Sequence, residues 1–188
     1  MFVFKPKEDE TIVRSYLGKG YVRWKRWKKN PSMHENKVLL WPDVSKAKGD
    51  PSIIKAIQRS VFYPAVHKLI DGGRRTVHID EALYMCHPSF LGMADELAMM
   101  HSIGRSGYLT MIDLMQRPSH LPLIIYGSAS HAFIGRTRER VDAQRMGELG
   151  SREGGRKLAA MVGDQGMHDF VWVPVAADRP AERFNLRH

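Results

Sequence analysis

Two adjacent carboxylates, Asp80 and Glu81, directly follow the short apolar run "TVHI" at residues 76–79. Such a run predicts a buried strand, and side chains just past the carboxyl end of a parallel strand face the crevice where ligands bind. There one carboxylate can hold a hydrated Mg²⁺ while its neighbour orients or deprotonates a water molecule, as in phosphoryl-transfer sites. The same short pattern is also typical of a helix N-cap.

A polar amide follows a second apolar run. Gln116 comes after "YLTMIDLM", residues 108–115, and opens the turn "QRPSHLP". If the two runs form neighbouring parallel strands, Gln116 lies beside Asp80 and Glu81, where an amide can contact a γ-phosphate or position the attacking water. The alternative is a Gln that only begins a Pro-rich turn.

A basic and aromatic segment lies nearer the N-terminus. The stretch "KGYVRWKRWKKNP", residues 19–31, carries six cations and no acid. Cations interleaved with flat rings suit a groove for phosphates and stacked bases. The alternative is a solvated loop whose tryptophans anchor it to the core, and both descriptions can hold together. The candidate nucleic-acid contacts are Arg23, Trp24, Lys25, Arg26, Trp27, Lys28 and Lys29.

Apolar runs alternate with helical patterns along the chain. Asp50 is a predicted N-cap with Pro51 at the first helical position, and Pro64 is expected to kink or divide the helix that follows. The alternation predicts an α/β fold with a mainly parallel sheet. Strands are expected at residues 1–6, 37–42, 76–80, 108–115, 131–135 and 169–175, and helices at 52–70, 88–104, 138–149 and 151–162.

The composition describes one ordinary domain with a strong positive charge. The chain has 188 residues, of which 43% are hydrophobic, enough to bury one core. Lys and Arg exceed Asp and Glu by 29 to 20, which favours a polyanionic partner. No apolar run has the length of a membrane span, and the single cysteine, Cys86, excludes an intrachain disulfide framework. We therefore expect a soluble, cytoplasmic protein without a membrane partner.

The segments "TVHIDEALYM", "GRSGYLTMIDLMQRPSHLP" and "SASHAFIGRTRERVDAQRMGELG" resemble FtsK/HerA-type P-loop ATPases, including relatives carried by phages and mobile elements. The resemblance is good over residues 74–150, where "TVHIDEALYM" is similar to a Walker B strand. It is looser over residues 1–73, where "FVFKPKED" resembles the second core strand. Residues 151–188 show no recognisable motif. The implied fold is a RecA-like P-loop sheet flanked by helices.

This resemblance implies a nucleotide site and a role for each of its residues. Asp80 would serve Mg²⁺ and, with Gln116, contact ATP; Glu81 would be the catalytic base, and Gln116 the sensor. Arg105 in "GRSG" and Arg136 in "GRTRER" are candidates for the arginine that one subunit sends to its neighbour's γ-phosphate, although either can be a structural ion-pair residue. The implied protein is a homo-oligomeric ring that translocates, transfers or packages DNA.

The sequence departs from the family at the phosphate-binding loop. No GxxxxGK[ST] Walker A motif occurs in the chain. We therefore expect residues 1–188 to form a single partial P-loop domain that lacks the first strand and helix, and that is inactive alone. We also expect Ile112 and Phe133 to lie on strands that are not hydrogen-bonded to each other, with an apolar slot between them. The alternative function is a non-catalytic basic module, derived from such an ATPase, that binds nucleic acid or a partner.

Overall fold

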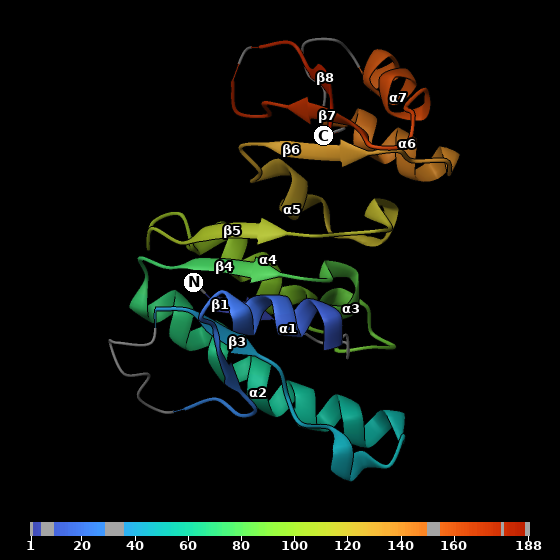
Figure 1. Ribbon diagram of the computed structural model, residues 1–188. Coiled ribbons are helices and arrows are strands. Elements are labelled where there is room, and N and C mark those ends of the chain that lie inside the picture. The colour runs from blue at the N-terminus through green and yellow to red at the C-terminus, as the bar shows by residue number, and fades with distance from the viewer. Residues whose placement is uncertain (1, 5–9, 29–35, 150–154, 178, 187–188) are drawn as a thin grey trace. The chain divides into compact units, whose positions relative to one another are not determined.

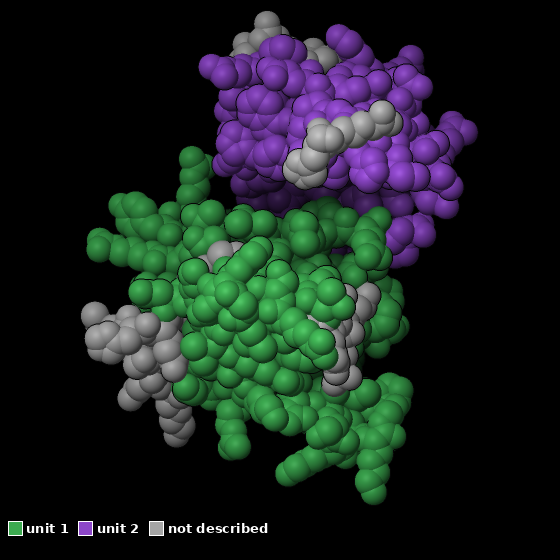
Figure 2. Space-filling model, in the orientation of Figure 1, with its two compact units in different colours: residues 1–116 green, residues 117–188 purple. Residues whose placement is uncertain are grey.

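The computed structural model describes residues 2–4, 10–28, 36–149, 155–177 and 179–186 (Figure 1). The chain divides into two compact units, unit 1 at residues 1–116 and unit 2 at residues 117–188 (Figure 2). Within the described ranges, no helix has both the length and the apolar character that crossing a membrane requires.

Unit 1 contains a five-stranded sheet in which every neighbouring pair is parallel. The strands are β1 (Phe2–Phe4), β2 (Val22–Trp24), β3 (Val38–Leu40), β4 (Thr76–Ile79) and β5 (Thr110–Asp113). They follow the order β2-β3-β1-β4-β5. Because all five strands are parallel, their carboxyl ends lie along one edge of the sheet. This mixed α/β arrangement confirms the predicted fold class.

Helices flank both faces of this sheet (Figure 1). They are α1 (Glu10–Gly18), α2 (Pro51–Gly72), α3 (Ala82–Cys86) and α4 (Ala94–Ile103), with a 3-10 turn at Ser45–Ala47. Val3 packs with Val13 of α1, whereas the ring of Phe4 lies 5.3 Å from that of Phe62 in α2. Successive strand residues point to opposite faces, so α1 and α2 cover opposite sides of β1.

The long helix α2 begins as predicted. The Asp50 side chain accepts hydrogen bonds from the backbone amides of Ser52 and Ile53 at 2.8 and 3.2 Å, and Pro51 is the first helical residue. Pro64 does not divide the helix, because α2 runs through it as one helix, whereas the alternative expectation of a kink stays a prediction. Buried residues on both sides of the proline hold the two halves of α2 against the same core; they are Val61, Phe62, Ala65 and Val66.

Unit 2 is built around a three-stranded antiparallel sheet. Its strands are β6 (Ala132–Gly135), β7 (Asp169–Val173) and β8 (Glu182–Asn185), in the order β6-β7-β8. Its helices are α5 (Leu123–Gly127), α6 (Arg140–Gly147) and α7 (Gly155–Gly163), with a 3-10 turn at Pro118–His120. A Cβ on Gly147 would lie 2.5 Å from the Gly155 carbonyl oxygen, so α6 and α7 approach closely only because both residues are glycine.

The strands β5 and β6 belong to different sheets. In the described part of the chain, β5 pairs with β4 and β6 pairs with β7, so no ladder joins residues 109–115 to residues 131–135. This confirms that Ile112 and Phe133 lie on strands that are not hydrogen-bonded to each other. The expected apolar slot concerns the two units together and stays a prediction.

Candidate active site at the carboxyl edge of the parallel sheet

Strands β4 and β5 deliver the predicted site residues to one edge of the sheet. The two strands are parallel neighbours, in register from Thr76 opposite Thr110 to Ile79 opposite Asp113. Beyond the ladder, the Leu114 amide donates to the Ile79 carbonyl and the Ala82 amide donates to the Leu114 carbonyl, both at 2.9 Å. These bonds keep the two chain segments together past the ends of the strands, where the site residues lie.

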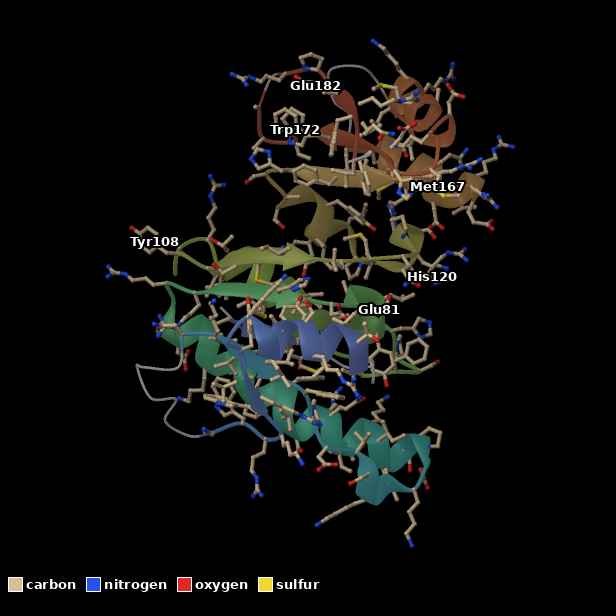
Figure 3. The ribbon with its side chains drawn as sticks, in the orientation of Figure 1. Glu81, Tyr108, His120, Met167, Trp172 and Glu182 are labelled. Carbon is tan, nitrogen blue, oxygen red and sulfur yellow. The ribbon has the colours of Figure 1, made fainter. Side chains whose placement is uncertain are left out.

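Asp80, Glu81 and Gln116 therefore lie at the same edge of the sheet, as predicted. Figure 3 shows Glu81 near the carboxyl ends of the strands, whereas Tyr108 marks the opposite end of β5. Gln116 lies beyond the end of β5, is exposed, and is the last residue of unit 1. Its amide is thus open to a ligand bound at this edge.

The two carboxylates have different surroundings. Asp80 is half-buried, and its backbone amide donates to the Phe4 carbonyl of β1 at 3.2 Å. Glu81 is only 7% exposed and occupies the N-cap position of α3 in an extended conformation, but its side chain does not cap that helix. The sequence also allowed these acids to be helix N-caps, but the Glu81 side chain does not have that role.

A tyrosine and a histidine flank Asp80 on the α1 side of the sheet. The Tyr16 hydroxyl of α1 lies 3.0 Å from Nδ1 of His78, a buried residue of β4. Burial raises the pKa of Tyr16, and the negative charge of Asp80 raises it further. The hydroxyl thus stays protonated close to Asp80. Sequence reasoning missed this contact, because 62 positions separate the two residues and no local motif marks them.

A buried contact between His101 and Asp113 anchors β5 to the helix behind it. His101 Nε2 of α4 lies 2.9 Å from a carboxylate oxygen of Asp113, and their side chains are 7% and 8% exposed. The pair fixes the end of the strand that precedes Gln116. Burial raises the pKa of the Cys86 thiol to about 12, and the charge of Asp113 contributes. Cys86 is therefore an unreactive packing residue.

The two candidate arginines lie elsewhere. Arg105 belongs to the turn between α4 and β5, and therefore to the amino edge of the sheet, opposite the edge that carries Glu81. Arg136 is exposed and follows β6 in unit 2. The structure does not bring Arg105 to the carboxylates of its own sheet. The role of either arginine stays a prediction.

The basic segment begins on β2, the edge strand farthest from β5. Trp24 is 1% exposed and its ring lies 5.4 Å from that of Trp27, so Trp24 has the anchoring role in the core and is not available to stack on a base. The Arg23 guanidinium lies 3.5 Å from the ring centre of Trp41.

The cations after β2 lie at the carboxyl edge of the sheet. Lys25 Nζ lies 2.8 Å from a carboxylate oxygen of Asp43, and hydrogen bonds from Lys25 and Ser45 hold the pKa of Asp43 well below its usual range. Arg26 is exposed, and Lys28 Nζ lies 4.8 Å from the ring centre of Trp24. Lys29 lies outside the described residues. The cations of residues 25–28 therefore share an edge with Asp80 and Glu81, separated by β3 and β1.

The donor set at this edge fits one hydrated Mg²⁺. Mg²⁺ is commonly held by one or two carboxylates together with waters and phosphate oxygens, and Asp80 supplies such a carboxylate at the end of a parallel strand. The described residues contain no cluster of three or more His, Cys, Asp or Glu side chains that could hold a metal ion.

The fold is that of the P-loop ATPases, which confirms the FtsK/HerA resemblance at the level of the fold. The solved structures that share it include B204, the DNA-packaging ATPase of Sulfolobus Turreted Icosahedral Virus, with a TM-score of 0.55, 16% identity, and alignment over 100% of this chain and 97% of B204. The genome-packaging NTPase B204 of Sulfolobus turreted icosahedral virus 2, in complex with ATP-gammaS, aligns with a TM-score of 0.52, 15% identity, and coverage of 97% and 94%. No protein-family model and no curated protein matches the sequence.

Proposed function

We propose that this chain is the Walker B and sensor part of an ATP-dependent motor that acts on DNA. The observation that carries the proposal is the placement of Asp80, Glu81 and Gln116 at one edge of a parallel sheet. Ligands of open α/β sheets bind at this edge. The fold shared with viral packaging ATPases supports a motor, and the net charge of +9 supports a polyanionic substrate.

Each residue has a definite part in the proposed reaction. Asp80 would hold Mg²⁺, and the bound ion would supply positive charge that offsets the negative charge developing on the phosphates. Glu81 accepts a proton from water as the water oxygen bonds to the γ-phosphorus, and the bond to the bridging β–γ oxygen breaks to release ADP. Gln116 orients that water. The Tyr16–His78 contact holds α1 beside Asp80.

Nucleotide binding by the purified 188-residue protein tests the proposal. We expect weak Mg²⁺-dependent binding of a fluorescent ATP analogue and negligible hydrolysis, because the sequence has no Walker A loop to surround the phosphates with backbone amides. Asp80→Asn should abolish the Mg²⁺-dependent part of the binding. Asp71→Asn is the matched control, because Asp71 is exposed at the end of α2, and it should bind like the wild type.

Three outcomes of this binding test would each contradict part of the proposed function. Equal binding by the wild type and Asp80→Asn would show that the nucleotide does not use this edge. Clear Mg²⁺-dependent turnover that Glu81→Gln abolishes would show that the chain has a phosphate site of another kind and is a complete catalyst. A complete lack of Mg²⁺-dependent binding would favour the second candidate function.

That second candidate is a non-catalytic module that binds nucleic acid through its basic segment. The absence of GxxxxGK[ST] from the sequence favours it, as do the cations that follow β2 at the carboxyl edge. Lys25, Arg26 and Lys28 are the described contacts that we propose for phosphates, and Lys29 completes the set. Trp27 is half-buried and is the tryptophan of this segment that remains for a base.

A further inference from the structure

One face of the antiparallel sheet in unit 2 is covered by aromatic rings. In the β6–β7 register Phe133 lies opposite Trp172 and Gly135 opposite Phe170. In the β7–β8 register Phe170 lies opposite Phe184. Directly opposite residues of an antiparallel pair share one face of the sheet. We call this surface the aromatic face, and its members are Phe133, Phe170, Trp172 and Phe184.

The other face of the same sheet forms the core of unit 2. Ile134, Val171 and Val173 are 0–6% exposed, and they alternate along the strands with the aromatic residues. Arg183, also on this side, donates to the Met161 carbonyl of α7 at 2.9 Å. Because the core uses the opposite face, packing within unit 2 does not account for the rings of the aromatic face.

The three phenylalanine rings of the aromatic face form a chain of ring contacts. Phe170 and Phe184 stack with centroids 5.8 Å apart, and Phe133 meets Phe184 edge-on at 6.2 Å. A Cβ on Gly135 would make an ordinary contact with a ring carbon of Phe170 at 3.4 Å, so the Phe170 ring lies over β6. Phe133 is 66% exposed, whereas Phe170, Trp172 and Phe184 are half-buried.

The position of Trp172 is fixed by a hydrogen bond. Its indole N–H donates to Nδ1 of His131 at 3.3 Å, and the two rings lie 5.9 Å apart. A surface whose rings are already held in place loses little conformational freedom when a flat ligand binds to it. The array is therefore preorganised for stacking.

We propose that the aromatic face is a stacking platform for single-stranded nucleic acid. All four large side chains of the face are aromatic, and every nucleobase offers a π-face that stacks on such rings regardless of sequence. A duplex conceals these base faces in its own stack, so the platform selects unpaired strands. The inference rests on the proposed action on nucleic acid but does not require ATP binding or hydrolysis.

The charges of unit 2 suit this ligand. Residues 117–188 contain 11 Lys and Arg, ten of them Arg, and eight Asp and Glu. Arg136 and Arg138 are exposed directly after Gly135, at the end of β6 that lies opposite Phe170. Glu182 lies opposite Trp172 at the other end of the face (Figure 3). Phosphates would therefore pass at the Arg136 end, away from the Glu182 carboxylate.

The test is the affinity of the full chain for a fluorescein-labelled oligo-dT strand, measured by anisotropy without nucleotide. Phe133→Leu keeps an apolar side chain but removes the ring, and it should weaken binding about 5- to 100-fold, the range for loss of one base–aromatic stack. Phe133→Tyr keeps the ring and should bind like the wild type. Tyr108→Leu is the matched control, because Tyr108 is a 74% exposed aromatic residue of unit 1.

Two further measurements distinguish stacking from purely electrostatic binding. Phe133→Leu should leave the slope of log Kd against log salt unchanged, because a stacked base releases no counterion. The oligonucleotide should quench tryptophan fluorescence, and Trp172→Phe should reduce that quenching while binding is retained. The wild type should also prefer oligo-dT to a duplex of equal length, and an oligo-U arm shows whether the platform distinguishes RNA from DNA.

Equal affinity of the wild type and Phe133→Leu would overturn the proposal. If Phe133→Leu instead removed self-association in analytical ultracentrifugation and left oligonucleotide affinity unchanged, the aromatic face would be a contact between copies of the chain. Neither result would bear on the nucleotide site, because the Asp80→Asn binding test is made without nucleic acid.

Discussion

Replacing Asp142 by alanine should destabilise unit 2 strongly. Asp142 lies in α6 and is 1% exposed. It accepts hydrogen bonds from the backbone amide of Ser119 at 3.0 Å and from the Ser119 hydroxyl at 2.5 Å. Its other carboxylate oxygen lies 2.9 Å from Nε of Arg117. This carboxylate therefore fixes the residues that directly follow Gln116 in the chain.

The expected cost is about 2–4 kcal/mol. A hydrogen bond to a charged group contributes about 1.5–3 kcal/mol, and the three contacts share one carboxylate, so their contributions do not add. The Arg117 side chain is 48% exposed, and water replaces its contact at little cost. Most of the loss therefore comes from the two Ser119 donors. Asp142→Asn keeps an acceptor for Ser119 and should cost about half as much.

The effect should depend on pH in a defined direction. Burial opposes ionisation of Asp142, but the hydrogen bonds from Ser119 and the charge of Arg117 outweigh it and hold the pKa of this carboxyl below its usual value. A depressed folded-state pKa adds stability above the unfolded pKa of about 3.9, and this stability is lost as pH falls through the folded pKa. The difference between the wild type and Asp142→Asn should thus be full at pH 7 and shrink below about pH 4.

Urea unfolding followed by Trp172 fluorescence measures this prediction, because the other three tryptophans lie in unit 1. Asp164→Ala is the matched control: this side chain is 91% exposed, lies 3.9 Å from Arg183, and should change stability by no more than about 0.5 kcal/mol. Equal unfolding free energies for the wild type and Asp142→Ala at pH 7 would refute the assignment of Asp142 as the anchor of this turn.

Two further predictions concern unit 1. Asp113→Ala should destabilise unit 1 by about 3–5 kcal/mol, because it leaves His101 buried without the Asp113 carboxylate. The His101→Leu/Asp113→Leu double variant should cost less. Urea unfolding in a Trp172→Phe background measures both variants, and a double variant as costly as the single one would contradict the prediction. Replacing the basic set with alanine should flatten the salt dependence of DNA affinity by up to about 0.9 in log–log slope per lost phosphate contact, and an unchanged slope would assign these residues to solubility. That set is Lys25, Arg26, Lys28 and Lys29.

The carboxyl edge could be predicted because its signals are local. The runs before Asp80 and Gln116 contain β4 and β5, and the pairing of these strands follows from the parallel sheet that alternating strands and helices indicate. The cap of α2 was equally local, since Asp50 and Pro51 adjoin the helix start.

Other elements had no comparable signal. Strand β2 lies inside a run of cations, and its Arg23 places its guanidinium over the ring of Trp41, which is 18 positions away. Strand β8 is short and mostly exposed, so its residues show no apolar run. Helices α1, α3 and α5 have nine residues or fewer and depend on tertiary contacts such as that of Tyr16 with His78. Contacts between distant positions cannot be read from local periodicity.

The position of Arg105 limits how an active enzyme can be assembled. Arg105 precedes β5 and Glu81 follows β4, so the two residues lie at opposite edges of one parallel sheet. Four strand residues alone span about 13 Å at the usual rise per residue. A γ-phosphate beside Glu81 is therefore out of reach of Arg105 in the same chain. If Arg105 acts on a phosphate, that phosphate belongs to a neighbouring subunit whose carboxyl edge faces the amino edge of this sheet. Such an arrangement is a head-to-tail contact between subunits, and it closes a ring when the rotation from one subunit to the next permits it.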